Sequence, residues 1–222
     1  MNKFLFLLLF FSANLFGQVG GETIYNFLNI AISAQQASLG GKALTLINDP
    51  NQPNWNPSLI HDRIENQVSI NYINYLADIS MGTISFTPKI NDKIGVLYTG
   101  ISYLNYGDFV KANDQGDEEG SFKAYDLAFS VGYAYNIPNS TIYVGANIKL
   151  INSVIENYSS VGIGTDLAIS YLKDSDPFMA TLVVRNIGSQ ITVYDDERED
   201  LPTEIMVGAS YKLQNVPITW HF

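Results

Sequence analysis

Residues 125–135 read YDLAFSVGYAY, and side-chain character alternates along this stretch without exception. Large apolar or aromatic residues such as Leu127 and Val131 occupy the odd positions, and small or polar residues such as Asp126 and Gly132 occupy the even ones. Because successive strand residues point to opposite faces, the pattern predicts a strand with one apolar face. A soluble sandwich strand would alternate too, but rings at both ends and tiny residues opposite are typical of a membrane barrel. The eleven residues also match the roughly 9 to 11 that a tilted strand needs to cross a bilayer. We therefore expect an all-β, antiparallel, up-and-down transmembrane β-barrel in contact with outer-membrane lipid.

The composition of the 222-residue chain fits this expectation. Hydrophobic residues make up 46% of the chain and charged residues 15%, below the roughly 25% charged residues of soluble domains. Twelve Lys and Arg stand against 22 Asp and Glu, giving a net charge of -10, which argues against a nucleic-acid partner because phosphates are bound through basic side chains. The chain has no cysteine, which excludes disulfides and thiolate metal sites.

The first 17 residues have the order of a signal peptide. Lys3 precedes the apolar run Phe4 to Phe11, small and polar residues follow, and we place the cut after Gly17. The alternative is a buried N-terminal helix. No later run approaches the roughly 18 apolar residues of a spanning helix, so strands would have to cross a membrane.

Residues 18–66 are expected to form an N-terminal plug and loop segment. Ser33 suits a helix N-cap, residues 34–39 favour helix, and Gly40 suits the position just past the helix end. Two interpretations stay open, a helix packed on the end of a barrel and a plug that enters its lumen. The candidate plug residues are Phe27, Leu28, Ile30, Leu39, Gly40 and Gly41. Prolines 50, 53 and 57 predict a loop over residues 48–59.

Residues 67–222 are expected to supply the barrel strands, because alternating segments recur between turn signals. The predicted strands are 67–75, 79–87, 93–104, 122–135, 141–154, 161–171, 178–185 and 203–213, with a ninth beginning at Ile218. Short connections alternate with the long ones at 105–121 and 186–202, which predicts long loops on the outer side and short turns on the periplasmic side. Bacterial barrels normally have an even strand number, so the odd count predicts an N-terminal fragment of a larger barrel. The alternative is that residues 218–222 form a genuine aromatic last strand and that the count is wrong by one.

No catalytic, cofactor or metal site is predicted. The chain has no GxSxG and no Walker A motif. His61 lies in the proline-rich region and His221 in the last strand, while Gly162 and Gly164 read as strand glycines facing a lumen. Both acidic clusters fall in the long loops and lack the calcium-loop spacing, so we interpret them as solvated or as docking surface. The candidate docking residues are Asp114, Asp117, Glu118, Glu119, Asp195, Asp196, Glu197 and Arg198.

Several segments together resemble the PorV/PorQ family of Bacteroidetes outer-membrane proteins of the type IX secretion system. They read TIYNFLNI at 23–30, NP at 56–57, SINYINYLADI at 69–79, YLNYGDF at 103–109 and RNIG at 185–188, and the similarity is greatest to the PorQ branch. The resemblance implies a barrel similar to FadL transporters with an N-terminal hatch at 25–41. It also implies a role in presenting cargo at the cell surface with PorZ, PorU and PorV.

Three functions follow as hypotheses. The first is a non-enzymatic anchor in a secretion apparatus, and the second is a FadL-like transporter of hydrophobic ligands. The third, an enzyme built on the loops, is supported least because no catalytic constellation is apparent.

Overall fold

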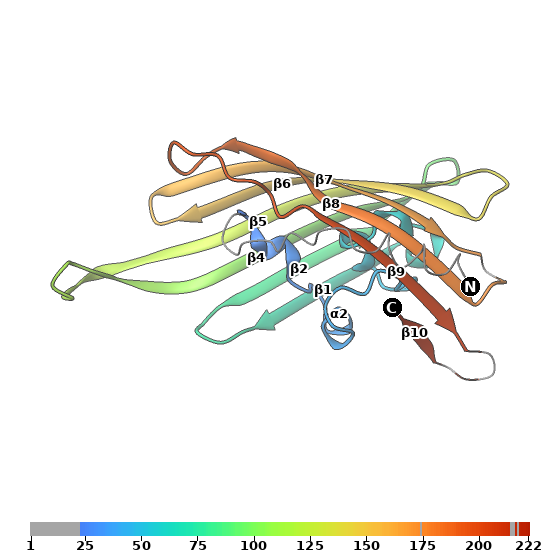
Figure 1. Ribbon diagram of the computed structural model, residues 1–222, viewed down its shortest axis with the longest axis horizontal. Helices are drawn as coiled ribbons and strands as arrows, with labels where there is room; N and C mark the ends of the chain where they lie inside the picture. The colour runs from blue at the N-terminus through green and yellow to red at the C-terminus, as the bar shows by residue number, and fades with distance from the viewer. Residues whose placement is uncertain (1–22, 174, 214–215, 217) are drawn as a thin grey trace, which may run out of the picture.

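A computed structural model describes residues 23–222 except 174, 214, 215 and 217. The expected signal peptide, residues 1–17, lies outside these described residues. A single antiparallel sheet dominates, and its strands follow one another in chain order as an up-and-down meander (Figure 1). The all-β, antiparallel prediction is confirmed. The strands are β1 (Gln67–Asn74), β2 (Ser80–Thr87), β3 (Lys89–Asn91), β4 (Gly95–Ala112), β5 (Glu118–Asn136), β6 (Ile142–Ile155), β7 (Tyr158–Tyr171), β8 (Phe178–Thr192), β9 (Glu204–Lys212) and β10 (Thr219–His221).

The sheet is open in the described part of the chain. β1 pairs with β2 alone and β10 with β9 alone, so these two strands form its edges. β3 lies off the main path and pairs with the start of β4. The strand arrangement is that of an up-and-down barrel, while closure into a barrel stays a prediction.

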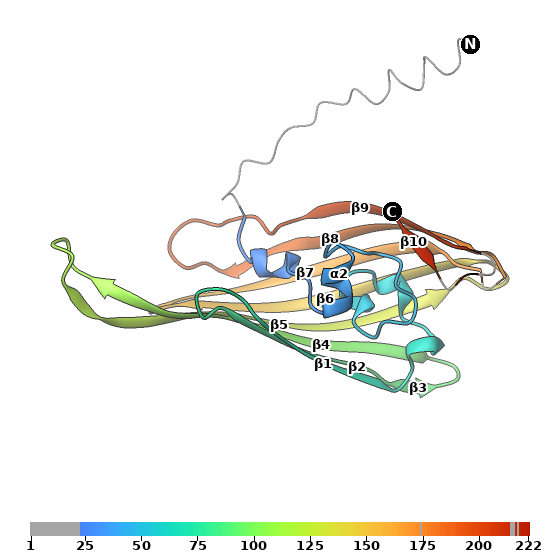
Figure 2. The same cartoon turned by 90° about the horizontal axis from the view of Figure 1, so that it is seen from below.

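The N-terminal segment, residues 23–66, lies on the concave face of the curved sheet (Figure 2). It contains η1 (Asn26–Asn29), α2 (Ala34–Ser38), η2 (Gln52–Asn54), η3 (Pro57–Leu59) and η4 (Asp62–Ile64). η3 contacts β5, β6 and β7. We call the end of the sheet that carries loops 75–79, 113–117 and 193–203 the ribbon end, and the opposite end the turn end.

α2 forms as its sequence predicts. The side chain of Ser33 accepts a hydrogen bond from the backbone N–H of Gln36 at 3.2 Å. At the other end Gly40 has a φ of 87° and Gly41 also has a φ of 87°. Their N–H groups donate to the carbonyls of Ala37 and Gln36 at 3.2 and 2.8 Å, the pattern in which a left-handed glycine ends a helix.

Burial along the strands is inverted relative to a soluble protein. On β5 the apolar Leu127, Phe129 and Val131 are exposed on the convex face, whereas Ala128 and Ser130 are buried on the concave face. β6 and β7 repeat this arrangement, with Ile148, Leu150, Ile163, Leu167 and Ile169 exposed. An apolar surface of this extent is unfavourable in water and marks contact with lipid or protein. Among the helices of the described residues, none is both long and apolar enough to span a bilayer.

At the turn end the predicted strands agree with the structure within a few residues, and only the short β3 was not predicted. At the ribbon end they differ. The expected long loop 105–121 is mostly strand, because β4 runs to Ala112 and β5 begins at Glu118. β8 continues past Arg185 to Thr192, and only residues 156 and 157 connect β6 to β7. These predictions were wrong because the apolar alternation stops at this end, although backbone pairing continues.

Candidate functional site

The concave face carries a buried ion pair at its centre. Nζ of Lys149 on β6 lies 2.9 and 2.7 Å from the two carboxylate oxygens of Asp166 on β7. The Lys149 ammonium also donates to Oδ1 of Asn186 at 2.9 Å, and the Asn186 N–H donates to Asp166 at 2.9 Å. A buried charge is tolerated only when it is paired and hydrogen-bonded, as both are here.

Arg185 on β8 joins the sheet to the N-terminal segment. Its guanidinium is buried and lies 3.9 Å from the centroid of the Trp55 ring, within the range of a cation–π contact. Nη2 donates to the carbonyl of Leu28 at 2.9 Å, and Nη1 donates to Oδ1 of Asn29 at 3.3 Å. One strand side chain therefore holds two separate parts of the N-terminal segment.

A second polar contact lies nearer the turn end. Nδ2 of Asn56 donates to the carbonyl of Leu44 at 2.9 Å and to Oγ1 of Thr181 at 3.0 Å. The hydroxyls of Ser58 and Ser170 lie 2.6 Å apart. All these polar atoms are buried and partnered, so this contact fixes the register between the N-terminal segment and strands β7 and β8.

Close backbone approach accompanies this contact. A Cβ placed on Gly145 of β6 would lie 2.4 Å from backbone atoms of Pro57 and Ser58. Only glycine leaves room for the N-terminal segment at this point of the wall.

The ribbon end is closed by aromatic and apolar side chains. The hydroxyls of Tyr25 and Ser160 lie 2.6 Å apart, and the Tyr25 ring fills the space beside Gly162. Burial raises the pKa of Tyr25. Leu201, from the loop between β8 and β9, packs in one cluster with Phe27 and Leu28. The loop therefore folds inward over the N-terminal segment.

The candidate plug residues occupy different environments. Phe27 and Leu28 are buried in this cluster, and Ile30 packs against it. Leu39 is 43% exposed, and Gly40 and Gly41 form the end of α2. The structure thus brings together the first three and leaves the other three at a helix terminus.

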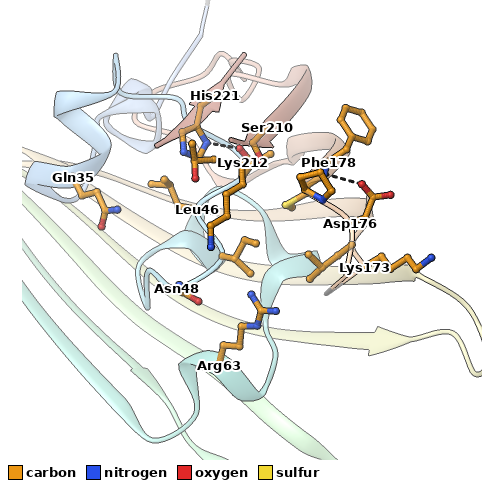
Figure 3. Close-up of a pocket in the computed structure, with 16 residues that line it drawn as sticks. Gln35, Leu46, Asn48, Arg63, Lys173, Asp176, Phe178, Ser210, Lys212 and His221 are labelled. Atoms are coloured by element: carbon orange, nitrogen blue, oxygen red, sulfur yellow. Dashed lines mark hydrogen bonds between the residues drawn. The ribbon is translucent and has the colours of Figure 1, made fainter. Parts of the chain in front are cut away.

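A cavity of about 490 Å³ opens at the turn end between the N-terminal segment and strands β8 to β10 (Figure 3). Arg63 and Lys212 project into it from opposite walls, whereas Lys173 is directed away. Asp176 accepts hydrogen bonds from the Phe178 N–H at 3.0 Å and from the Tyr171 hydroxyl at 2.9 Å. These hydrogen bonds lower the pKa of Asp176.

The candidate docking residues all lie at the ribbon end. Asp114 and Asp117 are in the loop between β4 and β5, and Asp195, Asp196, Glu197 and Arg198 are in the loop between β8 and β9. Glu118 and Glu119 are a correction, because they open β5 instead of lying in a loop.

All eight candidate docking residues are exposed, and the two clusters differ in their contacts. Asp114, Asp117, Glu118 and Glu119 are exposed. In the second cluster Asp195, Asp196, Glu197 and Arg198 are exposed as well. Backbone contacts of Asp200 and Glu199 hold the second loop against the N-terminal segment and β8, with the Ile24 N–H donating to the Asp200 carbonyl at 3.0 Å. Of the two acidic clusters, only the one at residues 114–119 therefore has no such contact with the N-terminal segment or β8.

No metal-binding group emerges from the described residues, where no three His, Asp or Glu side chains gather in a way that could hold an ion. His61 packs edge-on against Tyr143 with ring centroids 6.4 Å apart, and Nδ1 of His221 lies 2.7 Å from the Thr45 hydroxyl. The two histidines therefore have separate surroundings.

Sequence reasoning missed the central polar residues Lys149, Asp166 and Arg185 as site residues. Each is a charged residue within a predicted strand, on the face opposite the apolar side chains or at the strand end. An ionisable residue inside a membrane-spanning element marks a functional or structural site by default. This rule could have identified the three residues from the sequence. It could not have identified their partners, because these depend on strand register.

Comparison with protein families finds a match over most of the chain. A family model described as "Type IX secretion system protein PorV" matches residues 19–215. No curated protein and no solved structure matches the chain significantly. The family match covers the N-terminal segment and all strands through β9, and the chain therefore belongs to the PorV family of type IX secretion system proteins.

Proposed function

We propose that this chain is a non-enzymatic outer-membrane component of the type IX secretion system that docks partner proteins at the cell surface. The observation that carries the proposal is the inverted burial of the sheet. Apolar side chains cover the convex face, while a buried polar network lines the concave face. Hydrocarbon is the solvent in which this arrangement is favourable.

The proposed organisation has three parts. Residues 1–17 are a signal peptide, residues 18–66 are a plug, and residues 67–222 supply barrel strands that surround the plug. The ribbon end would face outward, because long loops of bacterial barrels lie outside. Secretion partners would then meet the exposed acidic residues Asp114, Asp117, Glu118 and Glu119.

The proposed partners are PorZ-like surface proteins, with PorU and PorV as further candidates, and the PorQ branch is the proposed place of the chain within the family. These assignments rest on the resemblance noted from the sequence. They are tested by purifying the tagged protein from outer membranes in mild detergent and identifying what co-purifies. Secretion-system proteins should be enriched over a control purification with an unrelated tagged outer-membrane barrel. Equal recovery in both purifications would contradict the proposal.

A FadL-like transport function is the alternative, and the contacts of the N-terminal segment argue against it. Arg185 and Asn147 donate hydrogen bonds to the carbonyls of Leu28 and Pro53, at 2.9 and 2.6 Å. Passage of a ligand would require these buried hydrogen bonds to break, and leaving buried polar groups unpaired is costly. Liposomes containing the protein should therefore take up a labelled fatty acid no faster than empty liposomes, and faster uptake would favour transport.

A further inference from the structure

Residues 106–123 form a two-stranded ribbon that extends beyond the rest of the sheet. Pairing of β2 with β4 reaches Asn105, and pairing of β5 with β6 begins at Ala124. Pairing of β4 with β5 continues to Ala112 and Glu118. Figures 1 and 2 both show this hairpin projecting past its neighbours. Within the described chain, the ribbon therefore has no further strand on either side.

The ribbon has few contacts of its own. Phe109 and Phe122 stack with ring centroids 5.1 Å apart, and Lys123 lies 3.7 Å from Asp108. Val110 is 61% exposed. A two-stranded ribbon is marginally stable in water, and each outer edge leaves alternate N–H and C=O groups unpaired. The unpaired backbone groups of the ribbon can therefore form hydrogen bonds with another strand.

Each edge of the ribbon is covered only at its base. The turn after β6 covers the base of the β5 edge, because the Glu156 N–H donates to the Lys123 carbonyl at 3.0 Å. The Glu156 carboxylate also pairs with Nζ of Lys111 at 2.6 Å. On the β4 edge the loop between β1 and β2 covers the base, because a Cβ on Gly107 would lie 3.3 Å from Cβ of Asp78. No described strand pairs with residues 108–112. Beyond this contact, the β4 edge is open over residues 108–112.

The charge of the ribbon indicates the chemistry of the partner. Residues 106–123 contain five acidic and two basic residues, and both lysines are engaged with carboxylates. Asp114, Asp117, Glu118 and Glu119 form no ion pair with any residue that the structure describes. Two copies in one membrane would bring these acidic tips side by side, and anionic headgroups would be repelled in the same way. A basic polypeptide fits both the charge and the open backbone edge.

We infer that an extended segment of a partner protein, containing lysine or arginine, adds as a strand to the β4 edge at residues 108–112. Main-chain hydrogen bonds would supply affinity, as in other complexes formed by strand addition, and the acidic tip would select a basic segment. The inference rests on the proposed function for the exposure of this end at the cell surface, and it adds the chemistry and binding mode of the partner.

The test uses the whole protein in detergent micelles and amidated octapeptides as probes. One peptide alternates lysine with valine, a second alternates glutamate with valine, and a third is the lysine peptide with every backbone nitrogen methylated. The lysine peptide should bind and slow amide exchange in residues 106–123 by about tenfold, with exchange in the β6–β7 hairpin unchanged. The methylated peptide keeps the charge but donates no backbone hydrogen bond, and it should not bind.

Matched variants test the role of the acidic tip. D114N/D117N/E118Q/E119Q should weaken binding of the lysine peptide by about tenfold. D195N/D196N/E197Q/E199Q removes the same number of charges from the neighbouring loop and should leave binding unchanged. The inference is overturned if the lysine peptide does not bind, if the glutamate or methylated peptide binds equally well, or if both variants lose affinity equally.

Secretion by cells distinguishes this inference from the proposed function. A host strain that lacks the protein should secrete cargo poorly, and the 195–199 variant should restore secretion better than the 114–119 variant. Equal restoration by the two variants overturns the inference and leaves the proposed function intact. Normal secretion without the protein overturns the proposed function itself.

Discussion

Lys149 and Asp166 face each other across β6 and β7, with Nζ and a carboxylate oxygen 2.7 Å apart and side chains 1% and 0% exposed. Both charges are out of water, so neither is stable without the other. The pair also contacts Asn186, and Asn186 donates to the carbonyl of Pro202 at 3.0 Å. This ion pair therefore connects the wall of the sheet to the loop that folds over the N-terminal segment.

Asp166→Asn should destabilise the protein by about 3 to 5 kcal/mol, because it leaves the Lys149 ammonium buried without a counter-charge. The double variant K149M/D166L removes both charges and should recover most of that loss. Urea unfolding in lipid vesicles measures both. Lys93→Met is the control, since Lys93 is exposed and forms no ion pair with a described residue. A single D166N variant as stable as the parent protein would contradict the central role of the pair.

Val131→Arg should cost about 2 to 4 kcal/mol if its convex face contacts the middle of the bilayer. Val131 is 40% exposed and lies on β5 between two neighbouring strands. Val110→Arg provides a matched control, because Val110 lies on the ribbon, beyond the strands that flank β4 and β5. Folding into vesicles should be weakened by the first substitution and unaffected by the second. Equal stability of the two variants would refute the assignment of the convex face to lipid.

The sheet could be predicted from sequence wherever strands have an apolar and a polar face. Residues 125–135 alternate strictly and lie within β5, and the same periodicity located β6 and β7 within a few residues. The alternation arises because the two faces of the sheet have different environments. The convex face carries apolar side chains, and the concave face packs against the N-terminal segment. The alternation therefore ends where a strand no longer has these two different environments.

The ribbon and the central charges show why the rest could not be predicted. Residues 106–123 pair as strands, but both faces are exposed and no alternation is required of them. Asn113 and Gly116 in this stretch also read as turn residues. The contact of Arg185 with Leu28 joins residues 157 positions apart, so it depends on the register of the whole sheet.

The pKa of Asp176 should lie below the ordinary value of 3.8, because the Phe178 N–H and the Tyr171 hydroxyl donate to the charged carboxylate. A carboxyl group with a lowered pKa stabilises the fold above its unfolded pKa, and this contribution is lost as the pH falls through the folded value. Tyr171→Phe removes one donor and should move the pKa upward, toward 3.8. Carbon-detected NMR titration measures the shift, and Tyr158→Phe, at the opposite end of β7, should leave it unchanged. A pKa that Y171F does not alter would show that the hydroxyl is not a donor in solution.

Gly145→Ala should loosen the N-terminal segment from the wall of the sheet. The added Cβ would lie 2.4 Å from the Pro57 backbone, so the backbone of η3 or β6 must move, and overpacking of this kind costs about 1 to 3 kcal/mol. Limited proteolysis of the folded protein should cut residues 44–66 faster in G145A than in the parent. Gly82→Ala is the control, because a Cβ at Gly82 has no atom within 4 Å and should leave proteolysis unchanged. Equal cleavage of the two variants would mean that the N-terminal segment is not held against β6.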